Sequence, residues 1–88
     1  MGCTRINNIE ELNNALKEEC FEFFILLGGG LVRSSKHIEF ASEPNTYYVF
    51  HEIDGTEETL TAEDIMDEEK SNIGKAIKNG YFFREIYD

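Results

Sequence analysis

The segment FEFFILL, residues 21–27, is followed directly by three glycines at residues 28–30. Its aromatic and β-branched residues run with almost no alternation of apolar and polar side chains, which is typical of a strand buried on both faces. The glycines permit a turn or a bulge, because a residue without a Cβ atom adopts backbone conformations that other residues avoid. We therefore predict a central strand that leads into a glycine-rich hairpin or bulge.

The segments around this strand alternate between helical and strand patterns. Apolar residues at helical spacing predict a helix in residues 6–19, whose first turn can donate hydrogen bonds to Asn7 or Asn8. Pro44 and Asn45 mark a turn between two strands, and Gly80 is suited to follow the last helix. The other predicted segments are strands at residues 31–40, 47–53 and 81–87, a helix that begins at Thr61, where Thr61 and Asp64 approximate a capping box, and a helix at residues 72–79 that Ser71 or Asn72 can cap.

The resulting order, α-β-β-β-α-α-β, predicts an α+β fold. A chain of 88 residues corresponds to one domain, residues 1–88. Hydrophobic residues make up 41% of the chain, enough for a packed core, so we do not expect general disorder. We predict a mostly antiparallel four-stranded sheet with the helices packed on one face.

Acidic residues dominate the middle of the chain. The net charge is −10, and residues 37–69 contain eleven acidic residues and no lysine or arginine. Protein surfaces more commonly mix both signs of charge. A strongly acidic surface repels nucleic acids and anionic lipids and attracts basic proteins. We therefore expect a basic protein partner, with no direct binding of nucleic acid or membrane.

Carboxylates held on turns and a short helix can imitate the phosphates of a nucleic acid. DNA carries one negative charge per about 1.7 Å of helix axis. The sequence therefore predicts a DNA mimic that occupies the basic groove of a nucleic-acid-binding protein, with two tyrosines as a desolvated anchor. The predicted partner-binding residues are Glu52, Asp54, Glu57, Glu58, Glu63, Asp64, Asp67, Glu68, Tyr47 and Tyr48. An acidic surface that only increases solubility is the alternative.

Enzymatic motifs are not apparent in the sequence. A calcium loop that began at Asp54 would need glycine at position six and glutamate at position twelve, where the chain has Thr59 and Ile65. The clustered carboxylates lie in segments that water solvates, so nothing marks a raised pKa for acid–base catalysis. Ser34 and Ser35 lack the context of a nucleophilic serine. We expect a protein without catalytic residues, cofactor or metal.

Two histidines leave one metal-based alternative open. If Phe40 lies opposite Tyr48 in a strand pair, His37 and His51 also lie opposite each other. Two histidines with a nearby carboxylate such as Glu39 form a known set of metal ligands. A slip of the register separates the two rings, so surface histidines are the expected arrangement.

Composition also bears on the cellular compartment. Two cysteines, Cys3 and Cys20, are too few for a disulfide framework, so we expect free thiols. The longest apolar run spans residues 23–27, far below the roughly 20 residues that cross a bilayer. The N-terminal residues lack the apolar stretch of a signal peptide. We expect the protein in the cytoplasm of a bacterial host cell.

The run RSSKHIEF…YYVFHEIDGTEETLT…SNIGKAIKNG resembles small uncharacterised proteins carried by phages, plasmids and integrative elements of Gram-positive bacteria, over about residues 20–80. In size and acidity the chain is also similar in type to anti-CRISPR and anti-restriction proteins, without matched residues. These resemblances imply a non-enzymatic inhibitor from a mobile genetic element. Its target would be a nucleic-acid-binding defence effector, such as Cas9 or its guide-RNA complex. The alternative is a generic interaction or accessory module of a mobile element, able to form a homodimer through an open sheet edge.

Overall fold

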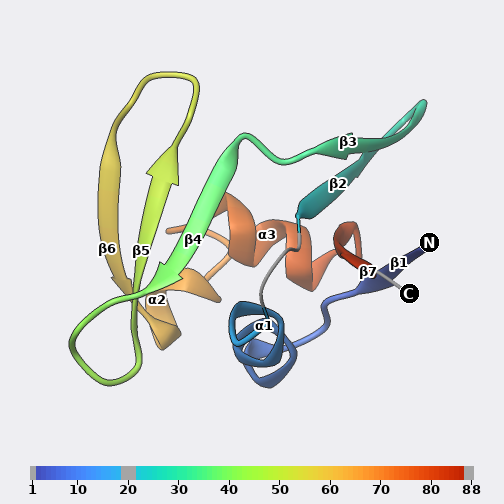
Figure 1. Cartoon of the computed structure of the whole chain (residues 1–88). Helices are drawn as coiled ribbons and strands as arrows, with labels where there is room; N and C mark the ends of the chain where they lie inside the picture. Colours follow the sequence, from blue (N-terminus) through green and yellow to red (C-terminus); the bar gives the residue numbers. More distant parts are fainter. Residues whose placement is uncertain (1, 19–21, 87–88) are drawn as a thin grey trace.

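The computed structural model describes residues 2–18 and 22–86, which form short helices and strands around a single core (Figure 1). The elements in chain order are β1 (Gly2–Arg5), α1 (Ile9–Leu16), β2 (Phe23–Leu27), β3 (Gly30–Arg33), β4 (Lys36–Phe40), β5 (Thr46–His51), β6 (Glu57–Thr61), α2 (Ala62–Ile65), α3 (Asn72–Lys78) and β7 (Phe82–Ile86).

The strands form two antiparallel sheets. The four-stranded sheet has the order β1-β7-β2-β3, and the three-stranded sheet has the order β4-β5-β6. Every strand pairing within them is antiparallel. The predicted α+β class and its antiparallel character are therefore confirmed. The described strands, however, are shared between two sheets, whereas the sequence predicted a single sheet of four strands.

The division into two sheets occurs within the predicted strand at residues 31–40. Ser34 is buried, and its hydroxyl accepts a hydrogen bond from the backbone N–H of Lys36 at 3.1 Å. Serine commonly forms such local bonds in turns, where they compete with a regular strand. The chain therefore leaves the first sheet after β3 and enters the second at β4. Two further strands were not predicted from the sequence: β1, which pairs with β7, and β6, whose Thr59 lies opposite Tyr48 of β5.

The segment FEFFILL lies inside its sheet but is not buried on both faces. Strand β2 pairs with β7 on one side and with β3 on the other, as expected for an inner strand. Of its side chains only Phe23 is buried, while Leu26 and Leu27 are 45% and 56% exposed. The strand pairing with β7 ends at Ile25, and the N–H of Leu26 still donates to Tyr81 O at 2.8 Å, so only the end of β2 extends with β3 beyond this neighbour (Figure 1). The prediction of burial on both faces is therefore wrong.

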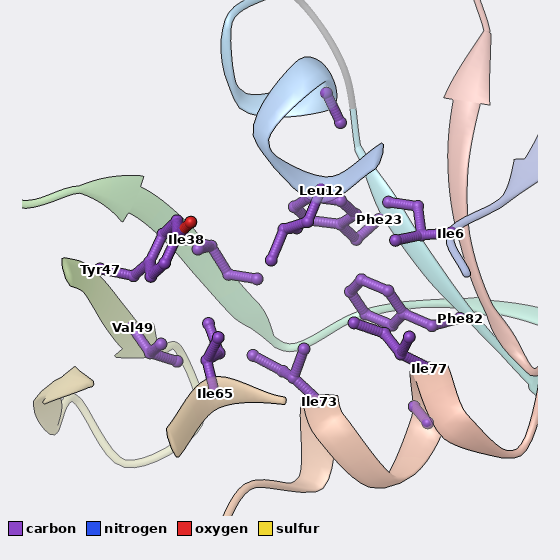
Figure 2. Close-up of a cluster of buried hydrophobic side chains, with 12 residues drawn as sticks. Ile6, Leu12, Phe23, Ile38, Tyr47, Val49, Ile65, Ile73, Ile77 and Phe82 are labelled. Atoms are coloured by element: carbon purple, nitrogen blue, oxygen red, sulfur yellow. The ribbon is translucent and has the colours of Figure 1, made fainter. Parts of the chain in front are cut away.

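The core lies between the two sheets and is closed by the helices (Figure 2). Phe23 and Phe82 stack with ring centroids 4.9 Å apart on the side of the four-stranded sheet. Tyr47 and Val49 point inward from β5. The helices contribute buried side chains to the same cluster, namely Leu12, Ala15, Ile65, Ile73, Ala76 and Ile77. Because these side chains point inward, Tyr48 and Phe50 of β5 are exposed on the opposite face of the three-stranded sheet.

Helix ends follow the predicted capping chemistry. The Asn8 side chain accepts a hydrogen bond from the N–H of Glu11, and the Thr61 hydroxyl accepts one from the N–H of Asp64. Ser71 caps α3 by accepting from two N–H groups in its first turn. Gly80, which follows the end of α3, has a φ of 77°, a conformation that glycine adopts at low cost. Local sequence therefore predicts these ends well.

Two expectations from composition can be compared with the structure. Cys3 is a free and exposed thiol, as expected, whereas Cys20 lies outside the described residues. Within residues 2–18 and 22–86, no helix has the length and apolar character needed to cross a membrane.

An ion pair joins the end of α1 to β7. Arg84 Nη2 lies 2.5 Å from Glu18 Oε2, and this hydrogen bond lowers the pKa of Glu18 from its ordinary value of 4.5. A lowered pKa in the folded state means that the native protein binds fewer protons than the unfolded chain near that pH. The pair therefore stabilises the fold fully above pH 4.5, and this stabilisation is lost as the pH falls from 4.5 through the lowered pKa.

We therefore expect Glu18→Gln to reduce the free energy of unfolding at neutral pH. The difference between wild type and variant should shrink progressively as the pH falls below 4.5, because Glu18 is then protonated first in the unfolded chain and, below its lowered pKa, also in the folded protein. Urea denaturation at a series of pH values measures it. A difference of the same size at pH 7 and pH 3 would show that the charge of Glu18 is not responsible.

Candidate protein-binding face

The acidic segment, residues 52–69, is spread over a turn, strand β6, helix α2 and the loop before α3. Lysine and arginine side chains from outside it form ion pairs with three of its carboxylates, and the imidazole of His51 makes a hydrogen bond to a fourth. These pairs are Glu52 with Arg33 (3.2 Å), Glu58 with His51 (2.8 Å), Asp64 with Lys70 (3.2 Å) and Glu68 with Lys78 (3.5 Å). The segment is therefore partly compensated in space, although the sequence shows no basic residue within it.

Two more of the predicted residues form turns. Asp54 accepts hydrogen bonds from the Thr56 hydroxyl at 2.7 Å and from the Thr56 N–H at 3.0 Å, and these bonds lower the pKa of Asp54. Asp67 accepts a hydrogen bond from the N–H of Glu69 at 2.8 Å. Both carboxylates thus have a local structural role, which aspartate commonly fills in turns. Their oxygens are only partly available to a partner.

The two predicted anchor tyrosines lie on opposite faces of β5. Tyr47 is 1% exposed, and its hydroxyl donates a hydrogen bond to Asn13 Oδ1. Burial raises the pKa of Tyr47, so the hydroxyl stays neutral. Tyr48 points the other way and is 46% exposed. The predicted contact role of Tyr47 is therefore wrong, because successive residues of a strand alternate between its faces, whereas Tyr48 is available to a partner.

Tyr48 belongs to a group of exposed side chains on the outer face of the three-stranded sheet. Glu39 lies opposite Tyr48, and Phe50 lies between His37 of β4 and Glu57 of β6. The five side chains line a shallow depression of about 360 Å³. We call this surface the acidic–aromatic face, and its residues are His37, Glu39, Tyr48, Phe50 and Glu57.

The chemistry of the acidic–aromatic face suits a cationic group. The exposed aromatic rings supply apolar area and π-electron density, and Glu39 and Glu57 flank them on the neighbouring strands. Arginine and lysine side chains bind favourably against aromatic rings and pair with carboxylates. His37 Nε2 lies 3.1 Å from Glu39 Oε1, so the imidazole can hold that carboxylate beside Tyr48. The outward positions of these three strands carry no lysine or arginine.

The register of β4 and β5 separates the two histidines. Phe40 lies opposite Tyr47, one residue away from the register that would pair His37 with His51. A slip of one residue moves a side chain to the other face of a sheet. His37 is therefore on the outer face, and His51 is on the inner side, where its two ring nitrogens contact Glu58 and Lys36. Among the described residues, no group of three potential ligands can hold a metal ion.

A second depression, of about 250 Å³, lies where the two sheets meet. Three of its charged lining residues pair with one another, because Arg33 contacts Glu22 at 3.4 Å and Glu52 at 3.2 Å, while Lys36 lies 3.3 Å from the His51 ring. Because these charges are already paired, the depression offers a partner less uncompensated charge than the acidic–aromatic face does. The remaining predicted residue, Glu63, is exposed on α2 and makes no ion pair within the described residues.

Sequence reasoning missed three members of the acidic–aromatic face, His37, Glu39 and Phe50. Phe50 follows Tyr48 by two residues along β5, so both side chains lie on the same face of the strand, and this spacing could be read from the sequence. The other two depend on the register between strands, which the sequence does not fix. Comparisons of the chain with protein-family models, curated proteins and solved structures found no match. The site is therefore assigned from its own geometry and charge.

Proposed function

We propose that this protein is a non-enzymatic binding protein that uses the acidic–aromatic face to occupy a basic surface of a nucleic-acid-binding protein. The observation that carries the proposal is the placement of Tyr48 and Phe50, exposed, between Glu39 and Glu57. A buried aromatic centre with charges around it is a common arrangement of binding energy in protein interfaces. Such a surface competes with nucleic acid by imitating both its stacked bases and its phosphates.

We further propose that the protein acts in the bacterial cytoplasm as an inhibitor encoded by a mobile genetic element. The target would be a defence effector whose groove binds nucleic acid, such as a CRISPR nuclease or its guide-RNA complex. The net charge of −10 supports this choice, because opposite charges accelerate the encounter with a basic groove and discourage contact with other acidic proteins. A generic interaction module of a mobile element is the alternative, and its binding would depend little on salt.

The test is a binding measurement with purified CRISPR nucleases, with and without guide RNA, at low and high salt. We expect Glu39→Lys with Glu57→Lys to weaken binding by about tenfold or more, because each reversal replaces attraction by repulsion next to the aromatic rings. The matched control is Glu43→Lys with Glu69→Lys, which makes the same change in net charge at exposed positions outside this face.

The control should retain binding within about threefold at physiological salt, where charges more than roughly 8 Å apart are largely screened. Equal losses in both double variants would mean that only the overall charge matters. Binding that neither double variant weakens would exclude the acidic–aromatic face. Failure of every nuclease to bind would reject the proposed target class, and the same salt series with other nucleic-acid-binding proteins then tests the wider proposal.

A further inference from the structure

Strand β3 forms an open edge of the four-stranded sheet. In the order β1-β7-β2-β3 it has a neighbour on one side only among the described strands, and all of its residues are exposed. The hairpin of β2 and β3 projects from the body (Figure 1). An edge strand of this kind presents unpaired backbone donors and acceptors along its free side.

The direction of the free backbone groups follows from the pairing with β2. The N–H of Ser34 donates to the carbonyl of Phe23 at 2.8 Å, so Ser34 faces β2. Residues of an antiparallel strand alternate between facing one neighbour and facing the other. The N–H and C=O groups of Leu31 and Arg33 therefore point away from β2, toward the open side.

The hairpin is also the part of this acidic chain that lacks charge. Residues 23–32 contain no acidic or basic residue. Four of their large side chains are between 43% and 56% exposed, namely Leu26, Leu27, Leu31 and Val32. The other edge strands, β1, β4 and β6, all carry charged residues, which is how proteins usually discourage edge pairing. Strand β3 has one charge, Arg33, which is neutralised by Glu22 and Glu52.

We propose that the open edge of β3 pairs with β3 of a second copy of this chain to form a two-fold symmetric dimer. Two copies with a net charge of −10 repel each other, so the hairpin, whose one charged residue is the ion-paired Arg33, is the surface on which they can approach closely. Antiparallel pairing of identical strands is self-complementary, as a two-fold interface requires. A single continuous eight-stranded sheet results, and the acidic–aromatic faces of both copies stay free.

The backbone groups also fix the register of this pairing. Each β3 has four backbone groups on its open side, the N–H and C=O of Leu31 and of Arg33. All four form hydrogen bonds with the second copy when Leu31 of one copy lies opposite Arg33 of the other. Val32 then lies on the two-fold axis, opposite Val32 of the second copy. Because this central pair is not hydrogen-bonded, its Cα atoms are about 4.5 Å apart. The two Leu31 residues are offset along the strands, with Cα atoms about 8 Å apart.

Cysteine cross-linking tests the dimer and its register together. In a Cys3→Ser, Cys20→Ser background, Val32→Cys is expected to form an intermolecular disulfide under mild oxidation, because its Cα separation lies within the range of about 4.4–6.8 Å that disulfides allow. Leu31→Cys has a similar exposure but lies outside that range, so it should cross-link several-fold less. Equal cross-linking of the two variants, or none in either, would overturn the proposal.

Sedimentation equilibrium of the unmodified chain provides an independent measurement. We expect dimerisation in the micromolar range that strengthens with salt, because salt screens the repulsion between acidic copies. Val32→Lys should weaken it by at least about tenfold, since edge lysines oppose strand pairing. Ile53→Lys makes the same charge change at a turn residue that is 87% exposed and should leave it unchanged. Wild type that stays monomeric at high salt, or equal losses in both variants, would contradict the dimer.

The dimer does not rest on the proposed function, and the two respond to salt in opposite directions. Binding of a basic partner weakens as salt rises, while the dimer strengthens. A failure of either one therefore leaves the other standing.

Discussion

Replacement of Gly74 by alanine is expected to destabilise the protein by about 2–3 kcal/mol, although alanine is normally the better helix former by about 1 kcal/mol. Gly74 lies in the first turns of α3, against the end of α2. A Cβ atom at this position would lie 2.7 Å from Ile65 O, 2.7 Å from Met66 C and 2.8 Å from Asp67 O. All three are backbone atoms, so relief requires α3 to move away from the core.

Thermal unfolding measures this effect. In a domain of this size, 2–3 kcal/mol corresponds to a Tm that is lower by about 10–20 °C. Gly28→Ala is the matched control, because a Cβ atom there would have no other atom within 4 Å and its φ is not in the left-handed region. Its Tm should stay within about 3 °C of wild type. A Tm for Gly74→Ala that matches the control would mean that α2 and α3 do not pack as closely as described.

The helix caps could be predicted from the sequence, whereas the close packing around Gly74 could not. The caps at Asn8, Thr61 and Ser71 depend on residues two or three positions away, so composition and spacing predicted them. The role of Gly74 depends on where α2 ends in space, and the residues around it only indicate an ordinary helix. The α+β class was predictable for the same local reason, because periodicity distinguishes helices from strands without reference to tertiary contacts.

Sheet membership and register were not predictable, and the candidate site depends on both. The buried Ser34 divides a stretch that reads as one strand, and it thereby places β3 and β4 in different sheets. The register of β4 and β5 decides that Glu39, and not Phe40, lies opposite Tyr48. Sheet membership and register depend on the combined energy of many contacts between residues far apart in the chain. That combined energy cannot be read from a single sequence.

The acidic segment illustrates the same limit for electrostatics. Read along the chain, its nine carboxylates have no basic neighbour among them. In space, Arg33, Lys70 and Lys78 reach three of them from outside the segment, and exposed pairs of this kind contribute little to stability because water screens them. The segment therefore has fewer uncompensated carboxylates than the sequence suggests. Glu57, which lies opposite Phe50, is not one of the three carboxylates that these basic residues contact.

Alanine substitution of two neighbouring tyrosines is expected to have opposite consequences. Tyr47→Ala removes a ring that is 1% exposed and packed between β5 and α1, and deletions of buried aromatic side chains cost about 3–5 kcal/mol. A domain of this size has a total stability near the lower end of roughly 5–15 kcal/mol, so this variant should be largely unfolded at 37 °C. Tyr47→Phe keeps the ring and loses only the hydrogen bond to Asn13, at a cost of about 1 kcal/mol.

Tyr48→Ala, by contrast, should change the free energy of unfolding by less than about 1 kcal/mol, because the ring is 46% exposed. Urea denaturation of the three variants measures these differences, and circular dichroism shows whether each is folded. If the proposed function is correct, folded Tyr48→Ala also binds its basic partner about tenfold more weakly, while folded Tyr47→Phe binds as wild type does. A strong loss of stability in Tyr48→Ala would contradict the assignment of Tyr48 to the outer face of β5. Equal binding by both folded variants would contradict the proposal that this outer face contacts the partner while the inner face stabilises the fold.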